Sequence, residues 1–163
     1  MIILDTNVVS ELIRAAPDPG VQAWVNSRPS TQVATTAVTA AELHYGVARL
    51  PAGQRRQQLA VAVSALLNDA LRSRIMPFDE RAARRYADVV TGREQAGRPI
   101  QVADAQIAAI CRELGAVLAT RNVKDIAETG IDLVNPWQVG TRDPGAPQFG
   151  ESCFTASAVV FSS

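Results

Sequence analysis

The chain has 163 residues, of which 47% are hydrophobic and 20% are charged, and its formal net charge at pH 7 is 0. This length suits one domain with a proper core, and this composition excludes a disordered chain. No apolar run approaches the roughly 18 residues of a membrane span, and the first residues lack the basic start of a signal peptide. Cys111 and Cys153 lack the spacing of a metal site. We therefore expect a cytoplasmic protein with no membrane contact.

Short apolar runs alternate with amphipathic segments along most of the chain. The first strand is expected at residues 1–4, followed by a helix from Thr6 to about Arg14 that is capped by Thr6 or Asn7. Strands that alternate with helices predict parallel βαβ units and a three-layer α/β/α sandwich. This domain extends over residues 1–140, and residues 141–163 form a tail of unknown role. Further strands are expected at 32–35, 74–77, 116–119 and 132–134, and further helices at 21–27, 36–49, 54–72, 80–96, 102–114 and 123–127.

Polar residues follow two of the predicted strands. Asp5 comes directly after the first strand, and Thr120, Asn122 and Asp125 follow the strand at residues 116–119. In open α/β sheets, ligands bind outside the carboxyl ends of the strands. These side chains are therefore expected at one edge of the sheet.

Two further acids lie on predicted helices and would reach the same edge. Asp104 lies seven residues before Cys111, on the apolar stripe of its helix and near the helix N-terminus. Glu42 lies between Val38 and Tyr45, on a side that we expect to face the core. A carboxylate beside a core face is costly unless another group neutralises it.

Each acid alone has an ordinary explanation: a helix cap for Asp5, a surface position for Glu42 or Asp125, and a first-turn acid for Asp104. Together they would repel one another unless a cation binds. Oxygen ligands favour a hard ion such as Mg²⁺ or Mn²⁺, which indicates metal-dependent phosphodiester chemistry. His44 has no nucleophile beside it in the sequence, and we expect it to be peripheral.

Four segments resemble the motifs of one family, the PIN-domain ribonucleases, and in particular the VapC-type toxins of type II toxin–antitoxin systems. They are residues 1–11 (MIILDTNVVSE), 39–46 (TAAELHYG), 102–109 (VADAQIAA) and 118–125 (LATRNVKD). The FitB-like branch ends in a motif that resembles Asn135-Pro136-Trp137 of this chain, so the resemblance covers about residues 1–137 and not the tail that follows. It implies a five-stranded parallel sheet, Mg²⁺ or Mn²⁺, RNA cleavage, a homodimer, and inhibition by a small cognate antitoxin of the VapB or FitA type.

By this match, Asp5, Glu42 and Asp104 correspond to the three central acidic ligands, with Asp5 and Asp104 as the main metal ligands. The fourth motif departs from the family pattern, because Asn122 stands where many relatives carry Asp. Asp125, one helical turn later, is the candidate for the missing acid. It stays open which of Asn122 and Asp125 matters more.

The predicted reaction is hydrolysis of an RNA phosphodiester, with one metal to activate water and a second recruited with the substrate. We expect Thr6, Asn7 and Thr120 to orient ligands and substrate, and Arg98 and Arg121 to contact phosphate. Residues 49–98 hold ten arginines against five acids, which fits either a phosphate-binding rim or solvated helix faces. Two other functions stay open: a flap- or exonuclease-like DNA nuclease, and a non-catalytic binding domain of the same fold.

The expected antitoxin would place an arginine among Asp5, Glu42 and Asp104 and exclude the metal or the substrate. Exposed ion pairs contribute little, so such a partner also needs an apolar anchor. Grooves beside residues 9–13 and 43–47 are the candidates for that anchor.

Overall fold

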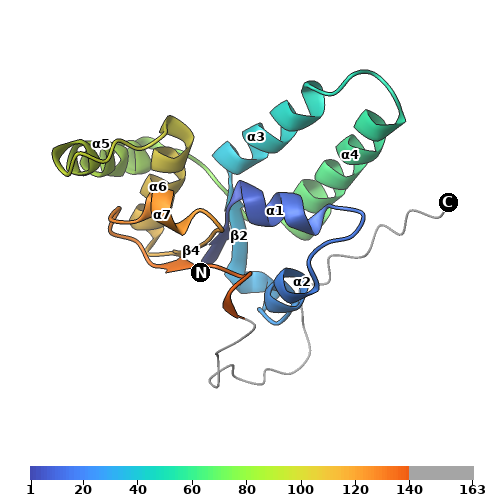
Figure 1. Ribbon diagram of the computed structural model, residues 1–163, viewed down its shortest axis with the longest axis horizontal. Helices are drawn as coiled ribbons and strands as arrows, with labels where there is room; N and C mark the ends of the chain where they lie inside the picture. The colour runs from blue at the N-terminus through green and yellow to red at the C-terminus, as the bar shows by residue number, and fades with distance from the viewer. Residues whose placement is uncertain (140–163) are drawn as a thin grey trace.

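The computed structural model describes residues 1–139, which form one five-stranded sheet with helices on both faces (Figure 1). This confirms the predicted α/β/α sandwich and its five-stranded parallel sheet, while the predicted tail at 141–163 lies outside the described residues. All strand pairs are parallel, and the strand order is β3-β2-β1-β4-β5. The strands are β1 (Ile2–Leu4), β2 (Val33–Thr36), β3 (Ile75–Met76), β4 (Val117–Ala119) and β5 (Leu133–Val134).

The chain adds β2 and β3 on one side of β1 and then β4 and β5 on its other side, so β1 pairs with both β2 and β4. Ile2 is in register with Val33 of β2 and with Val117 of β4. Crossovers to the two sides leave a crevice at such a switch point, outside the carboxyl ends of the strands. The fold therefore directs attention to the residues that follow β1 and β4.

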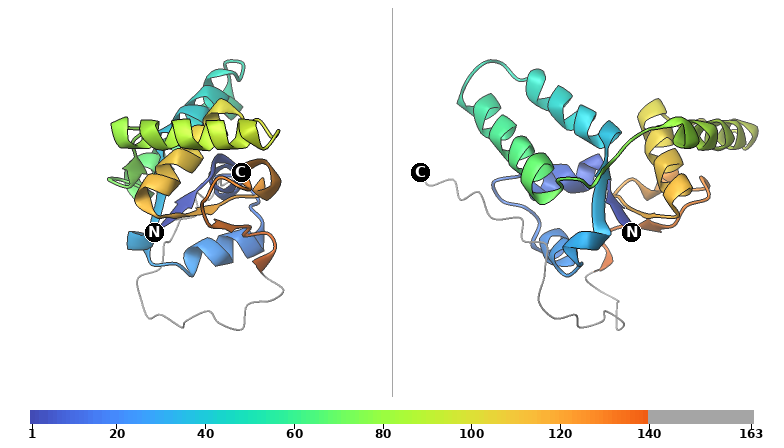
Figure 2. Two further views of the ribbon diagram at one scale, coloured as in Figure 1. Left: turned by 90° about the vertical axis from the view of Figure 1, so that its left-hand side faces the viewer. Right: turned by 180° about the vertical axis from the view of Figure 1, so that it is seen from behind.

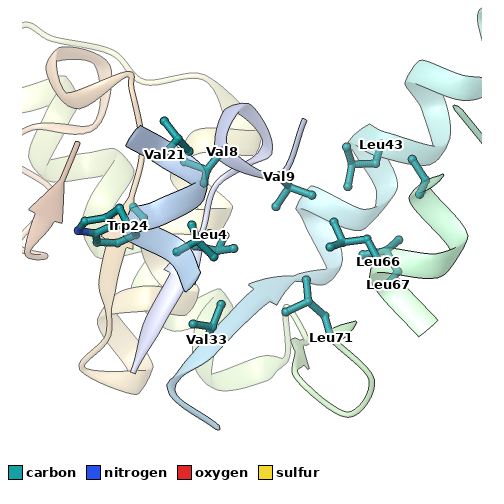
Figure 3. Close-up of a cluster of buried hydrophobic side chains, with 13 residues drawn as sticks. Leu4, Val8, Val9, Val21, Trp24, Val33, Leu43, Leu66, Leu67 and Leu71 are labelled. Carbon is teal, nitrogen blue, oxygen red and sulfur yellow. The ribbon is translucent and has the colours of Figure 1, made fainter. Parts of the chain in front are cut away.

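One face of the sheet is covered by the helices between β1 and β3. Leu4 of β1 and Val33 of β2 point to this face, where they pack with Trp24, Leu43 and Leu71 (Figure 3). Beyond the sheet, α3 and α4 lie side by side and project away from it (Figures 1 and 2). The elements are α1 (Thr6–Leu12), α2 (Pro19–Asn26), the 3₁₀ turn η1 (Ser30–Gln32), α3 (Ala37–Ala48), α4 (Gln54–Ala65) and the π-helical turn η2 (Leu66–Ala70).

The other face is covered by α5 (Glu80–Gln95), α6 (Val102–Leu114) and α7 (Val123–Ile126) (Figure 2). Ile3, the neighbour of Leu4, points to this face, because successive strand residues alternate sides. It packs with Leu118, Ile110 and Cys111, all fully or almost fully buried. Cys111 is thus a core residue, as predicted. None of the helices in residues 1–139 is long and apolar enough to cross a membrane.

Three local expectations are wrong. The cap of α1 is Asp5, not Thr6 or Asn7, and the long helix expected at 54–72 changes to π-helical geometry after Ala65. Tyr45 is 64% exposed and does not face the core beside Glu42. The physical reason is that the second half of α3 lies beyond the sheet edge, so only its side toward α1 and α4 is buried.

Candidate active site

Asp5 lies at the carboxyl end of β1, buried to all but 4% of its surface. Its carboxylate accepts three hydrogen bonds: from the backbone N–H of Thr6 at 2.7 Å, from the side-chain amide of Asn7 at 2.5 Å and from the hydroxyl of Thr120 at 2.6 Å. The first of these bonds also caps α1. Donors from two neighbouring strand ends therefore fix the position of this carboxylate.

The bonds around Asp5 extend into the loop after β4. The Asn7 amide also donates to the Thr120 hydroxyl at 3.0 Å, and its carbonyl oxygen accepts the backbone N–H of Arg121 at 3.0 Å. The Thr120 hydroxyl oxygen in turn accepts the backbone N–H of Asn122 at 3.0 Å. Thr6, Asn7 and Thr120 thus each contact Asp5, and Asn7 and Thr120 also hold the loop that carries the fourth motif.

Glu42 reaches this cluster from the middle of α3. Its carboxylate oxygen Oε2 accepts a hydrogen bond from the hydroxyl of Thr6. Thr6 therefore contacts two of the predicted acids, one through its backbone N–H and one through its side chain. The helix that carries Glu42 starts directly after β2, where the Thr36 hydroxyl caps it through the Thr39 N–H at 3.0 Å.

Asp104 lies in the first turn of α6 and is half-buried. The pKa of its carboxyl is raised from 3.8 to about 6, first by burial and then by the negative charges of Asp5, Glu42 and Asp125, in that order. Within residues 1–139 its side chain forms no hydrogen bond and no ion pair. The three acids that the sequence placed here thus face a common space, together with Asp125.

The fourth motif forms the start of α7. Asn122 is the N-terminal cap residue of this short helix but makes no side-chain capping bond, and Asp125 lies in its first turn. Both residues are exposed, and neither side chain is hydrogen-bonded to another described residue. Asp125 nevertheless contributes to the raised pKa of Asp104, so its charge acts on the site.

The four carboxylates at this edge are not neutralised by the protein. None of the ion pairs among residues 1–139 includes Asp5, Glu42, Asp104 or Asp125. In the part of the chain that the structure describes, no three acidic, His or Cys side chains gather closely enough to chelate one ion. The acids of this site therefore act on one another through their charges, but their carboxylates are not in direct contact. His44 is exposed and has no contact with the cluster that bears on its chemistry.

The two arginines predicted to contact phosphate have different surroundings. Arg98 forms an ion pair with Glu128 at 2.7 Å, beyond the end of α7. Arg121 lies over the ring of Trp137, with its guanidinium carbon 5.0 Å from the ring centre. In the sequence, Trp137 stands out only as part of the Asn135-Pro136-Trp137 motif, and no short-range pattern predicts its contact with Arg121.

In the arginine-rich segment, residues 49–98, several arginines have partners within the protein. Arg84 pairs with Glu80 at 2.6 Å, and Arg85 pairs with Glu113 at 3.0 Å. Arg93 is buried and donates to the carbonyl oxygen of Ala127, just after α7, at 2.5 Å. These contacts give Arg84, Arg85 and Arg93 partners within the protein, whereas Arg55, Arg56, Arg72 and Arg81 form no ion pair among residues 1–139.

A groove of about 500 Å³ opens between α1, α3 and α4, beside Glu42. It agrees with the predicted grooves beside residues 9–13 and 43–47, although Val9 itself is buried in the core. Thr6 and Glu42 line one end of it, and Arg14 and Arg55 are the cations among its lining residues. Its apolar lining includes Ile13, Leu43, Leu50, Leu59 and Val63.

Comparison with known proteins places these residues in context. Residues 2–131 match the family model described as PIN domain. The chain is 40% identical over 138 residues to "VapC ribonuclease Y4jK" of Sinorhizobium fredii, covering 85% of this chain and 99% of that protein. It is 36% identical over 137 residues to "Toxin FitB" of Neisseria gonorrhoeae, covering 84% and 99%. The solved structure of FitAB bound to a DNA fragment contains a chain with a TM-score of 0.78 and 35% identity, covering 84% of this chain and 96% of that one.

Proposed function

Because the chain belongs to the PIN-domain family and is homologous to the VapC and FitB toxins, we propose that it is the toxin of a toxin–antitoxin system and acts as a metal-dependent endoribonuclease. The observation that carries this proposal is the convergence of four unneutralised carboxylates at the switch point of the sheet. The intact acids argue against a binding domain that has lost its activity.

The donor set suits Mg²⁺ or Mn²⁺, because carboxylate oxygens are the ligands that hard divalent ions prefer. Asp5 and Asp104 would be the main ligands, while Glu42 and one of Asn122 and Asp125 would act on the ion from a greater distance, since among residues 1–139 no three acidic side chains are close enough to chelate one ion. The pKa of Asp104 is raised first by burial and then by the negative charges of its neighbours, and the repulsion from those neighbours is relieved when a cation binds, which supports this fit. A divalent ion in this position supplies an activated water and stabilises the charge that develops on the phosphate.

The residues around the metal ligands would hold the reacting groups in place. Asp5 is fixed by the three donors that surround it, so little rearrangement is needed on that side when a substrate arrives. Thr6 holds Glu42 near Asp5, and Asn7 ties the loop after β4 to the same carboxylate. Arg121 extends from that loop and is available to an RNA phosphate.

The test compares RNA and DNA oligonucleotides of one sequence, incubated with purified protein in Mn²⁺, in Mg²⁺ and in EDTA. We expect internal cleavage of the RNA with either metal, and none in EDTA or with Asp104→Asn. Cleavage of the DNA alone would support the flap- or exonuclease-like alternative. Undiminished RNA cleavage in EDTA would contradict the metal-dependent mechanism.

The partner that we propose is an antitoxin with an arginine and an apolar segment. The arginine would enter the acidic site near Glu42, and the apolar segment would fill the groove between α1, α3 and α4. The toxin would act as a homodimer within this complex. Expression of the chain alone should arrest growth, and co-expression with the short protein encoded immediately upstream should restore it. Growth that continues normally, from a protein that cleaves RNA in vitro, would contradict the toxin role but not the nuclease.

A further inference from the structure

Arg121 is tied by its backbone to the proposed active site but directs its side chain elsewhere. Its N–H donates to the Asn7 carbonyl oxygen, and the Asn7 amide donates to Asp5, so two hydrogen bonds connect its backbone with the buried carboxylate. The Arg121 side chain is exposed and forms no ion pair with any residue in 1–139. By contrast, Arg98 is engaged by Glu128. Arg121 is therefore the arginine that is free to meet an anion at this edge.

Within residues 1–139, the Arg121 guanidinium lies over the ring of Trp137. Trp137 follows β5, the strand next to β4, so both residues lie beyond the carboxyl ends of paired strands. Trp137 is half-buried against the hydrophobic cluster under α1 and α2, and its backbone N–H donates to the side-chain oxygen of Asn135 at 3.1 Å. Pro136 is buried between them. The ring is thus held by the turn and the core, and it offers a fixed surface to a flexible arginine.

A cation over an indole ring is attracted to its face yet keeps its N–H groups free at the edges. The contact therefore restricts where the Arg121 guanidinium lies without neutralising its charge. An ion pair with an acid would also restrict it, but would consume the donors that a phosphate needs. This is the difference between Arg121 and Arg98.

The chain contains a matched comparison. Arg28 lies over Trp24 at 4.8 Å, but it precedes β2 and is therefore at the amino edge of the sheet, opposite the acidic cluster. The two pairs share the same contact type and differ in their edge of the sheet and in burial, since Arg28 and Trp24 are more buried than Arg121 and Trp137. A role in substrate binding should be confined to the pair at the carboxyl edge.

We propose that Trp137 is a positioning residue that holds the Arg121 guanidinium over its ring at the carboxyl edge of the sheet, where it contacts a phosphate of single-stranded RNA whose chain also reaches the acidic site. The inference rests on the proposed ribonuclease function. It assigns to the Asn135-Pro136-Trp137 turn a part in substrate binding that acts through Arg121 and not through direct contact with the RNA.

The test measures the Kd of a fluorescein-labelled single-stranded RNA by anisotropy, in an Asp104→Asn background so that the probe stays intact. The probe is an oligonucleotide that the wild-type protein cleaves, so a failure of the proposed function is recognised separately, by absence of that cleavage. We expect Arg121→Gln to weaken binding about tenfold through loss of a charge-assisted bond. Trp137→Leu should weaken it about threefold, because the cation–π contact is modest at an exposed site.

The deciding comparison is the double variant. If Trp137 acts through Arg121, Trp137→Leu has no further effect once Arg121→Gln is present. Arg121→Gln should also flatten the slope of log K against log salt by about 0.7, as expected for one lost phosphate contact to a single strand. Trp137→Phe should restore most of the binding, and Arg28→Gln should leave both the Kd and the salt slope unchanged.

Three outcomes would overturn the inference. In one, Trp137→Leu weakens binding equally with and without Arg121, which would mean that the ring contacts RNA directly or only supports the fold. In another, Arg121→Gln leaves the Kd and the salt slope as they were. In the third, Arg28→Gln has the same effect as Arg121→Gln. If Trp137→Leu does not fold, as judged by its thermal melt, Trp137→Phe and Arg121→Gln still provide the salt-slope test.

Discussion

The two halves of the acidic site are built differently. On the β1 side, Asp5 accepts three hydrogen bonds and Glu42 accepts one from Thr6. On the α6–α7 side, the side chains of Asp104 and Asp125 have no hydrogen-bond partner among residues 1–139, and the pKa of Asp104 is raised to about 6. One half is organised by the protein itself, and the other half is left with uncompensated charge.

The difference shows which interactions fold the site and which await a ligand. Hydrogen bonds to a buried carboxylate stabilise both the carboxylate and the elements that supply the donors. Carboxylates that repel one another, by contrast, destabilise the empty site and favour any bound cation. We therefore expect that substitutions on the β1 side lower both stability and activity. Substitutions on the α6–α7 side should lower activity but remove charge repulsion, so they should not lower stability.

The largest effect is expected from the two main metal ligands. Asp5→Asn and Asp104→Asn should each lower RNA cleavage by more than about 100-fold, since even the groups that support metal ligands are worth 10- to 100-fold. Only Asp5→Asn should destabilise the protein, by about 1–3 kcal/mol, because the amide carries fewer acceptor sites for its three donors. Cleavage assays and thermal melts of both variants measure this. Equal melting temperatures for the two variants would remove the distinction between the halves.

The next effect concerns the residues that orient Asp5. Asn7→Ala and Thr120→Val should each lower activity by about 10- to 100-fold, because both side chains hold the carboxylate and the loop after β4. Thr91→Ala is the control, since Thr91 is an exposed threonine on α5 that bonds only to its own helix. Activity within twofold of wild type for Asn7→Ala would mean that Asp5 does not depend on this network.

The sandwich and its sheet were predictable from the sequence, because buried strands such as residues 116–119 and helix signals such as Gly115 are local. Gly115 ends α6 in the left-handed conformation, with φ of 58°, as its place after Leu114 predicts. The extent of α3 that the sheet covers is not local. Tyr45 has the spacing of a core residue, but it is exposed because no element packs against it.

The proximity of the acidic residues was also predictable, since Asp5 follows a strand and Asp104 lies on the apolar stripe of its helix. The sequence does not show which of these carboxylates the protein itself hydrogen-bonds and which it leaves without a partner. Asp5 serves as a helix cap and as a member of the acidic cluster at once, so the two explanations weighed for it are not alternatives. The contact between Arg121 and Trp137 depends on the pairing of β4 with β5, which brings distant residues together and leaves no local pattern.

A smaller effect is expected within the fourth motif. Asp125→Ala should lower activity about tenfold, and more than Asn122→Ala does, because the charge of Asp125 acts on Asp104 while the Asn122 side chain brings none. Asn122→Asp should be tolerated. Both variants should fold as wild type, since neither side chain is hydrogen-bonded to a described residue. Small and equal effects of both alanine substitutions would confine the site to Asp5, Glu42 and Asp104.

The smallest effect is a pH-dependent change in stability. The pKa of Asp104 lies at about 6 in the folded protein and near 3.8 when unperturbed, so between these values the folded state binds more protons than the unfolded state. Stability is therefore lost as the pH rises through this range, and the penalty is fully present above about pH 6. Asp104→Asn removes the ionisable group and should escape the penalty.

We expect the metal-free Asp104→Asn protein to melt about 2–4 °C above wild type at pH 7, which corresponds to about 1 kcal/mol once solvent screening of this half-buried group is allowed for. The difference should shrink as the pH falls from 7 to about 3, which is below both pKa values, so that Asp104 is largely protonated in both states. Mn²⁺ at pH 7 should raise the melting temperature of the wild type more than that of the variant, because the ion relieves the same repulsion. Asp69→Asn, a change at an exposed acid of η2, should show neither trend. A constant difference across this pH range would mean that repulsion at Asp104 does not distinguish the two halves of the site.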